Sequence, residues 1–415
     1  MKKFLTSTGT LFINGVLELI DDKEVDMERV ATATSDQMLE LRRANSARCA
    51  EAIRSAGSMT IAEVAQVTGL SRPTVRARLQ DLYEAGLLAE VAAAAPTGAG
   101  RPASRYSFVA DAGIVAGLEL AKHVERLLIT DLLGRELWHG ERPVATQSAQ
   151  KRLDSAVAWV QEVATELGKK LVRVGVAVPG SMDPSGVFIE AAAFEEWRGQ
   201  AVPPLVSAAF DVPTDTMHDL AAAMSTERRM GAAKDVDTFV VPILWHRVSA
   251  GIVIDGRVHG GTNGRAGNIQ QRFSAAQNHL DDAEWPSDPH VSALVSAAAD
   301  GDAEADASLH RFTALAAEQI AMLQLVIDPE LIVLYGPLAA HDTLVSRVIA
   351  HLDHDLPSVA PVVVSEFGQF GTVIGAALTA LDSAVEDLIG PGMAPHLLDR
   401  TRLSSAISGR RTVLV

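Results

Sequence analysis

Arginine and hydroxyl side chains gather in the segment SRPTVRAR, where Ser71 precedes Arg72, Thr74, Arg76 and Arg78. A guanidinium group binds phosphate oxygens, and a bidentate pair with guanine contributes about 1–3 kcal/mol of base discrimination. If the segment is helical, these side chains lie on or near one exposed face. The residue types and their spacing therefore predict a helix that contacts duplex DNA.

Three helices and a hairpin are expected between residues 39 and 108 as the frame for these side chains. In the first helix, Leu41, Asn45, Cys49 and Ile53 fall on one helical stripe. Gly57 follows the stripe and ends the helix, because glycine adopts the left-handed conformation that stops a helix.

The second and third helices are marked by their caps. Thr60 and Glu63 have the spacing of a capping box, and Gly69 ends a helix of about two turns. Ser71 caps the third helix and Gly86 stops it, with apolar residues recurring at helical spacing: Val75, Leu79 and Leu82. A helix, a short turn containing glycine and a serine-capped helix are typical of a helix-turn-helix.

Two strands, over residues 87–91 and 106–109, are expected to form the wing of this module. Their connection holds Arg101 within Gly-Arg-Pro, an extended tripeptide that can lay an arginine along a narrow minor groove. The complete set of residues expected to contact DNA is Ser71, Arg72, Thr74, Val75, Arg76, Arg78 and Arg101. The alternative interpretation is a helical protein–protein module with solvated arginines.

The composition of the 415-residue chain is that of a globular protein with two or three domains, because 48% of its residues are hydrophobic and 21% are charged. Its single cysteine, Cys49, excludes a disulfide scaffold and a multi-cysteine zinc site. No apolar run approaches the length of about 18 residues that a membrane span needs, so we expect a cytoplasmic protein without a membrane partner.

Charge is distributed unevenly along the chain. Residues 38–108 hold nine arginines and no lysine against six acidic residues, a net charge of +3. Residues 1–37 carry four basic and seven acidic residues, a net charge of −3, so the remainder from Val109 onward carries the whole −16. A small basic module joined to a large acidic body indicates a nucleic-acid-binding head on a domain that does not bind the polyanion. Ordinary surface variation is the alternative.

Mixed strands and helices follow from residue 112 onward, which predicts two α/β lobes with a cleft between them. Turns are expected at residues 183–186 and 255–256. The expected strands cover residues 114–120, 124–131, 171–178, 239–244, 250–254 and 331–335. The expected helices cover residues 151–168, 220–230 and 307–325.

Several segments together resemble the ROK family (repressors, open reading frames and sugar kinases) over roughly residues 39–381. They are ELRRANSARCAEAIR, GLSRPTVRARLQDLYEAGLL, GRP, VGVAVPGSMDP, WRG, AGIVIDGRVHGGTNGRAGNI and VIDPELIVLYG. The resemblance implies an actin-like (ribonuclease-H-like) two-lobed α/β body, with the N-terminal winged helix-turn-helix of the repressor branch.

The phosphate-binding glycines of the family's kinases are missing from this chain. Residues 119–123 read Glu-Leu-Ala-Lys-His where the family has Asp-Leu-Gly-Gly-Thr. Residues 245–249 read Trp-His-Arg-Val-Ser where it has Gly-Thr-Gly-Ile-Gly, and a third Gly-Gly element is reduced to Tyr335-Gly336-Pro337. Since a Cβ blocks close approach of the backbone to phosphate, we expect no ATP binding, no kinase activity and no cofactor.

The family's zinc site is also absent. Gln271 takes the place of its histidine ligand, and the three cysteines of its CxCGxxGC run are missing. His279 and His290 therefore have no thiolate partners, and we expect them to be surface residues and the chain to bind no metal.

The sugar pocket is partly retained. The family's Asn-Asp, whose Asp is the base in kinases, corresponds to His218-Asp219, and the Glu that holds sugar hydroxyls corresponds to Asn268. The expected ligand-binding residues are Gly180, Trp197, His218, Asp219, Asn268 and Gln271, with Arg198 beside Trp197. Alternatively, Asp219 caps the following helix and Trp197 is a buried structural residue.

These observations predict a ROK-like transcriptional regulator that binds a double-stranded DNA operator as a homodimer or tetramer. Its body would sense a sugar or a related small polar ligand; alternatively the body is only an oligomerisation scaffold, or the protein is a sugar kinase. The expected organisation is an extension (1–37), the winged helix-turn-helix (38–110), the two-lobed body (111–385) and a tail (386–415).

Overall fold

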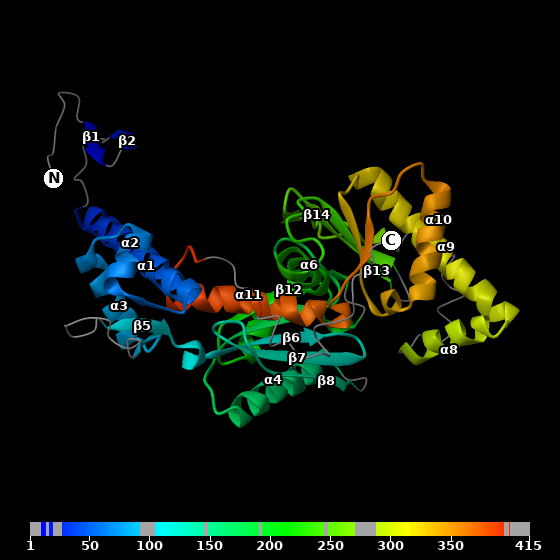
Figure 1. Ribbon diagram of the computed structural model, residues 1–415, viewed down its shortest axis with the longest axis horizontal. Coiled ribbons are helices and arrows are strands. Elements are labelled where there is room, and N and C mark those ends of the chain that lie inside the picture. Colours follow the sequence, from blue (N-terminus) through cyan, green and yellow to red (C-terminus); the bar gives the residue numbers. More distant parts are fainter. Residues whose placement is uncertain are drawn as a thin grey trace, which may run out of the picture. The chain divides into compact units, whose positions relative to one another are not determined.

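The computed structural model describes residues 10–13, 16–19, 27–91, 104–144, 148–190, 193–244, 248–269, 288–393 and 398 (Figure 1). The chain divides into two units. The first holds residues 1–107 and 389–393, and the second holds residues 108–388 and 394–415. Among the described residues, no helix is both long enough and apolar enough to cross a bilayer.

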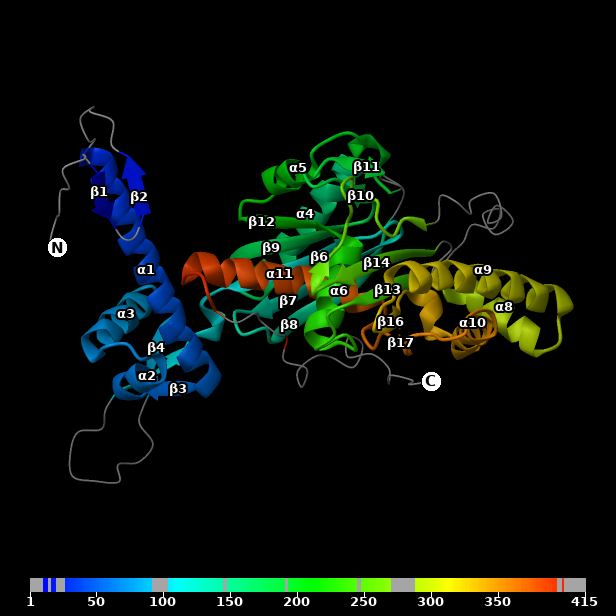
Figure 2. The ribbon, with the colours of Figure 1, turned by 90° about the horizontal axis from the view of Figure 1, so that it is seen from above.

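The first unit is a winged helix-turn-helix, as the sequence predicts. Helices α2 and α3 pack against the long helix α1, as Figure 2 shows. A three-stranded sheet of order β3-β5-β4 completes the unit, and a separate hairpin precedes α1. The elements are β1 (Thr10–Ile13), β2 (Val16–Leu19), α1 (Met27–Ala56), β3 (Ser58–Thr60), α2 (Ile61–Thr68), α3 (Arg72–Glu84), β4 (Leu88–Val91) and β5 (Arg105–Phe108).

Helix α1 differs from the sequence prediction in two ways. It begins at Met27, so the expected division between residues 37 and 38 falls inside the helix. Leu41 is 62% exposed, whereas Ala47, Cys49 and Ile53 are fully buried, so the prediction that Leu41 belongs to the core stripe was wrong. Within residues 36–56 of α1, whose burial is described, the fully buried side chains begin at Ala47, and α2 and α3 pack against this helix.

The first lobe of the second unit is a five-stranded sheet of order β12-β9-β6-β7-β8. Helix α4 covers one face and α11 covers the other (Figure 1). The elements are β6 (Ile114–Leu120), β7 (Val124–Asp131), β8 (Glu136–Pro143), α4 (Ala149–Glu166), β9 (Leu171–Val178), β10 (Ser181–Met182), β11 (Phe188–Glu190), α5 (Val202–Ala209) and β12 (Thr214–His218).

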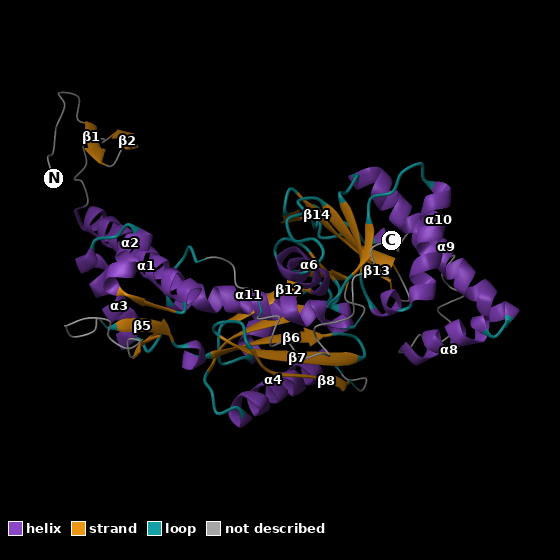
Figure 3. Cartoon of the chain, viewed as in Figure 1, coloured by secondary structure: helices purple, strands orange, loops and turns teal. Residues whose placement is uncertain are grey.

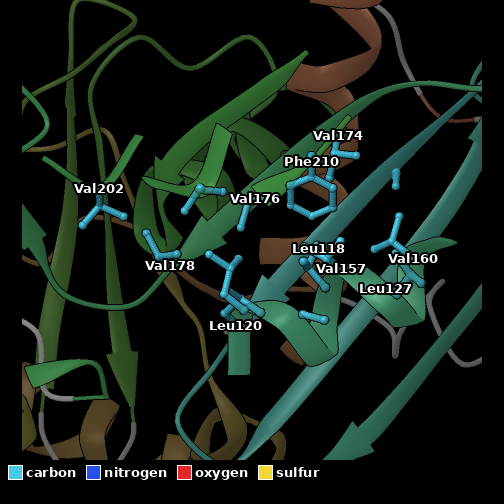
Figure 4. Close-up of a cluster of buried hydrophobic side chains, with 14 of the residues drawn as sticks. Leu118, Leu120, Leu127, Val157, Val160, Val174, Val176, Val178, Val202 and Phe210 are labelled. Atoms are coloured by element: carbon cyan, nitrogen blue, oxygen red, sulfur yellow. The ribbon is translucent and has the colours of Figure 1, made fainter. Parts of the chain in front are cut away.

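The core of this lobe forms where the β-branched and leucine side chains of the sheet meet α4. Figure 4 shows side chains of β6, β7, β9 and α4, including Leu118, Leu127, Val157 and Val176, pointing into one cluster. Burying such a side chain contributes about 1.5–3 kcal/mol relative to leaving it exposed. The near-continuous apolar run of β9 has this cluster on one face and α11 on the other.

The second lobe is a five-stranded sheet of order β15-β14-β13-β16-β17, with α6 on one face and α9 and α10 on the other (Figure 3). The expected strands over residues 239–244 and 250–254 are present and pair antiparallel, and the expected turn at residues 255–256 joins β14 to β15. The elements are α6 (Asp219–Met230), β13 (Phe239–Leu244), β14 (Val248–Ile254), β15 (Arg257–Val258), α8 (Asp288–Ala299), α9 (Ala303–Ile327), β16 (Leu331–Leu334), α10 (Asp342–Asp355), β17 (Val362–Val364) and α11 (Gly371–Leu388).

Helix α11 lies between the first sheet and α6, and backbone atoms come into close contact on both sides of the helix. A Cβ on Gly117 would lie 2.5 Å from the carbonyl oxygen of Val373, and Gly175 faces the carbonyl of Ala376 in the same way. Gly375 faces the carbonyl of Ala222 on α6. The expected boundary at residue 386 falls inside this helix, so the body extends at least to Leu388.

Candidate nucleic-acid interface and ligand site

The caps that the sequence predicts hold the helix-turn-helix in place. The Thr60 hydroxyl accepts from the N–H of Glu63 at 3.2 Å, and the Glu63 carboxylate accepts from the N–H of Thr60 at 2.6 Å. The turn passes through Gly69 in the left-handed conformation, with φ +69°. The Ser71 hydroxyl then accepts from the N–H of Thr74 at 3.2 Å, which starts α3.

The exposed face of α3 carries Ser71, Arg72 and Arg76, with Thr74 half-buried beside them. Neither arginine forms an ion pair with another described residue. Both guanidinium groups are therefore available to a phosphate or a base edge. The expected contacts of these four residues with DNA stay predictions.

Two residues of the expected set do not lie on this face. Val75 is fully buried with Leu79, so it belongs to the core of the unit and cannot reach a base. The Arg78 side chain is only 10% exposed and is ion-paired with Asp81 at 3.0 Å. Both predictions were wrong because residues 75, 78, 79 and 82 form the helix face that packs inward.

The wing is tied to the helices by a residue that sequence reasoning did not single out. Arg105 on β5 donates to the hydroxyl of Ser58 at 3.2 Å, to its carbonyl at 2.6 Å and to the Glu63 carboxylate at 3.1 Å. Arg105 thus fixes the wing against the start of α2. Arg101, the expected minor-groove residue, lies outside the described residues.

Polar residues of the second unit lie at the carboxyl edge of the first sheet. Strands β6, β9 and β12 are parallel, and their register places Glu119 beside Ala177 and Ala177 beside Met217. Glu119, Gly180 and Asp219 consequently end at one edge, which is where open α/β sheets bind ligands. Glu119 is buried and paired with Arg126 at 3.1 Å, and desolvation raises its pKa in spite of that arginine.

His218, not Asp219, is the N-cap of α6. Its Nδ1 accepts from the N–H of Leu220 at 3.2 Å, and the Asp219 carboxylate accepts from the same group at 2.7 Å. Desolvation raises the pKa of Asp219, while His218 and the backbone N–H of Leu220 partly offset it. A half-buried carboxylate with a raised pKa at a sheet edge is typical of a ligand site, although it also bonds to its own helix.

Two other candidates have structural explanations. Trp197 is 4% exposed, stacks on Phe194 with ring centroids 4.5 Å apart and belongs to the core of the first lobe. These contacts favour the structural alternative, and the place of Trp197 in a ligand site stays a prediction. Gly180 has φ +131° and lies against Phe188 and the carbonyl of Glu190, so close packing requires a glycine there.

Asn268 links the two lobes. Its amide nitrogen donates to the Glu190 carboxylate at 2.7 Å. Its Oδ1 is buried and has no hydrogen-bond partner in the part of the chain that the structure describes. Gln271, like residues 245–247 and His279, lies outside the described residues, and no group of three or more metal-ligating side chains occurs within them.

Protein side chains form hydrogen bonds at two of the segments that the sequence analysis compared with the kinases' phosphate loops. The carbonyl of Ala121 accepts from Arg152 at 2.6 Å. The hydroxyl of the buried Tyr335 accepts from the N–H of Thr372 at 3.1 Å, at the start of α11, and its ring lies against Gly371. Arg126 donates to Gln369 at 2.8 Å as well as to Glu119, so its charge is neutralised within the protein.

Comparisons with known proteins match a known family to each of the two units. The profile of the ROK family matches residues 115–270 and 269–383, and that of winged helix-turn-helix DNA-binding domains matches residues 51–89. The N-acetylglucosamine repressor of Escherichia coli is 24% identical over 228 residues, 54% of this chain and 56% of the repressor. The chain spans about half the length of the curated relatives it matches.

Solved structures show the same fold at low sequence identity. A ROK family transcriptional regulator, a homologue of the E. coli MLC protein, has a TM-score of 0.60 and 19% identity, covering 84% of this chain and 98% of its own. A ROK family glucokinase from Streptomyces griseus, bound to glucose and AMPPNP, has a TM-score of 0.53 and 20% identity, covering 65% and 99%. The expected actin-like body with a winged helix-turn-helix is thereby confirmed, and the chain belongs to the ROK family.

Proposed function

We propose that this protein is a transcriptional regulator that binds duplex DNA through its winged helix-turn-helix. The observation that carries the proposal is the exposed face of α3. There Arg72 and Arg76 lie beside Ser71 and Thr74, and neither arginine forms an ion pair with another described residue. Repression is the mode of action suggested by relatives such as the E. coli N-acetylglucosamine repressor. Recognition of two half-sites would require an even-numbered assembly of this chain.

Selection of duplex DNA from a random pool by the full-length protein tests the proposal. We expect enrichment of an inverted repeat whose binding weakens steeply with salt. Arg76→Ala should weaken binding about 10-fold or more, since a bidentate base contact is worth about 1–3 kcal/mol. Arg311→Ala, which removes the same charge from α9 of the other unit, is the matched control and should bind normally. Failure to enrich any sequence would contradict the proposal.

The body, in this proposal, binds no ATP and is not a kinase. Ala121 replaces a phosphate-loop glycine, the Tyr335 hydroxyl accepts from the N–H of Thr372 in the first turn of α11, and Arg126 is neutralised by Glu119. A bound nucleotide would have to displace these groups. Addition of MgATP should therefore leave the melting temperature unchanged, whereas a shift or sugar-dependent ATP hydrolysis would favour the kinase alternative.

We further propose that the body binds a sugar or a related small polar ligand near Asp219 and Asn268. The carboxylate of Asp219 and the Oδ1 of Asn268, which has no hydrogen-bond partner among the described residues, supply the acceptors that a polyol needs. A sugar that raises the melting temperature of the wild-type protein but not of Asp219→Ala would support this assignment.

The scaffold alternative has its own support, because Trp197 is a core residue and Asn268 is already bonded to Glu190. A body that serves only for assembly would show no thermal shift with any sugar. No sugar would release the DNA from such a protein, and Asp219→Ala would bind DNA as the wild type does.

A further inference from the structure

Strand β4 of the winged helix-turn-helix carries an exposed acidic residue, Glu90. The hydroxyl of Tyr106 on β5 donates to the Glu90 carboxylate at 3.3 Å. Strands β4 and β5 are neighbours in the sheet, so this hydrogen bond crosses from one strand to the next. It holds the carboxylate of Glu90 over the wing sheet.

Glu90 differs from other carboxylates of the same unit in its partner. Three of them are each paired with an arginine, at 2.8–3.1 Å: Glu51 with Arg54, Glu63 with Arg105 and Asp81 with Arg78. Glu90 is bonded to a neutral phenol instead, and it forms no ion pair with another described residue. A basic module therefore presents one exposed negative charge that no described arginine offsets.

The pair of Glu90 and Tyr106 lies beside the exposed face of α3. Strand β4 packs against this helix. Arg76 and Tyr83 are both exposed and are seven residues apart, which places them on the same face of α3. Burial and the Glu90 carboxylate raise the pKa of the Tyr106 phenol, whereas the Arg76 guanidinium opposes that rise. Since such effects weaken with distance, Arg76 is close to the pair.

We propose that Glu90 is a specificity-determining residue, which weakens the binding of the protein to duplex DNA in general. A carboxylate beside Arg76 repels the phosphates that Arg76 attracts, and this repulsion acts on every sequence alike. A carboxylate also accepts from the exocyclic amine of cytosine, so a sequence that presents this amine to Glu90 offsets the repulsion. Tyr106 is the positioning residue, because its hydroxyl holds the carboxylate. The inference rests on the proposed function.

The test compares Glu90→Gln with Glu40→Gln in the full-length protein. Glutamine keeps an acceptor oxygen for Tyr106 and removes only the charge. Glu40 is exposed on α1, so Glu40→Gln changes the net charge of the unit by the same amount. We expect Glu90→Gln to bind unrelated duplexes about 3- to 10-fold more tightly than the wild type, and the selected repeat within about 2-fold. The gain should shrink as salt rises, because salt screens repulsion between exposed charges.

Tyr106→Phe tests the positioning role, since it removes the hydrogen bond and leaves the charge of Glu90. The released carboxylate can turn toward solvent, so we expect a smaller gain for unrelated duplexes, about 2-fold, with the same dependence on salt. Unchanged affinity of Glu90→Gln for unrelated duplexes would overturn the inference. So would an equal gain in Glu40→Gln, because only the net charge of the unit would then matter.

A titration without DNA tests the contact itself. The ring signal of Tyr106 in nuclear magnetic resonance, identified by its loss in Tyr106→Phe, follows the ionisation of the phenol. Glu90→Gln should lower the pKa of Tyr106, because it removes the carboxylate that raises it. If the wild type binds no DNA, the proposed function fails and the inference fails with it. If the wild type selects a repeat and Glu90→Gln leaves its preference unchanged, only the inference fails.

Discussion

Adjacent residues of α3 have opposite environments, because each step along a helix turns the side chain by about 100°. Val75 is fully buried, and Arg76 next to it is exposed. Arg78 lies two residues further, returns to the inner face and is paired with Asp81. Only some of the arginines in this segment are therefore exposed to a binding partner.

Substitutions at these two neighbours should separate stability from DNA binding. Val75→Ala removes buried methyl groups and should lower the free energy of unfolding of the first unit by about 2 kcal/mol. Arg76→Ala should change it by less than about 0.5 kcal/mol, as surface substitutions do, while weakening DNA binding. Denaturant unfolding, monitored through the hydrogen exchange of α3, measures the loss of stability in Val75→Ala. Equal destabilisation by both variants would contradict this division.

Asp219 should destabilise the folded protein at neutral pH. Its pKa is raised in the folded state, which means that folding disfavours the charged carboxylate. The resulting loss of stability begins above the ordinary aspartate pKa and reaches its full size above the raised pKa. Asp219→Asn keeps the acceptor for Leu220 and should increase the free energy of unfolding by about 0.5–1 kcal/mol at pH 7. The gain should shrink as pH falls through the raised pKa toward the ordinary aspartate value of about 3.9.

Asp183 provides a control of opposite sign. Its carboxylate accepts from the hydroxyl of Ser185 and from the N–H of Val187, which lowers its pKa. Its contribution to stability is therefore present above the ordinary aspartate pKa and is lost as pH falls through the lowered value. Asp183→Asn should lower the melting temperature at pH 7. If Asp219→Asn and Asp183→Asn changed the stability at pH 7 by the same amount and in the same direction, neither change would reflect the ionisation of the carboxylate.

Helix α11 is the element on which both lobes depend. It packs against four strands of the first sheet, β6, β7, β9 and β12, and against α6, and its first turn is bonded to Tyr335 of the second lobe. The contacts are close enough that glycines replace side chains at the crossing points. Such packing transmits displacement because it leaves no space for local adjustment.

A glycine-to-alanine substitution in α11 should destabilise the body even though alanine favours helices. Gly375→Ala gains about 1 kcal/mol of helix propensity. The new Cβ would overlap the carbonyl of Ala222, and such overpacking typically costs about 1–3 kcal/mol, more when backbone atoms must move. We expect a lower melting temperature. Gly260→Ala, with nothing within 4 Å of its Cβ, is the control and should melt like the wild type.

At the scale of the whole molecule, charge distinguishes the DNA-binding module from the rest of the chain. The net charge of the chain is −16, and residues 38–108 are positive. A polyanion is therefore attracted to the winged helix-turn-helix and repelled by the body. The affinity of the full chain for DNA should depend on salt through the few arginines of the first unit.

Arg72→Ala should test this charge effect. If Arg72 neutralises one phosphate, its loss should reduce the slope of log K against log salt concentration by about 1 and weaken binding to all sequences alike. Titrations across a salt series with the selected repeat and with unrelated duplexes measure both effects. A loss confined to the selected repeat would instead assign Arg72 to a base contact.

The sequence by itself determined the elements whose signals are local. Strands β6, β7, β9 and β13 have the predicted bounds, and the caps at Thr60 and Ser71 are as expected, because alternation and capping act over a few residues. Helix α11 was not predicted. A helix that is buried on several sides is apolar around much of its circumference, so its hydrophobic residues show no clear helical period. Strands β8 and β12 were also not predicted.

The tertiary structure alone decided which candidates share a site. The core position of Trp197, the bond from Asn268 to Glu190 and the bond from Tyr106 to Glu90 each join residues that are not sequence neighbours. Such contacts depend on how layers pack, and no local pattern encodes them. A residue type indicates what chemistry is available, but burial and pairing determine whether that chemistry can reach DNA or a ligand.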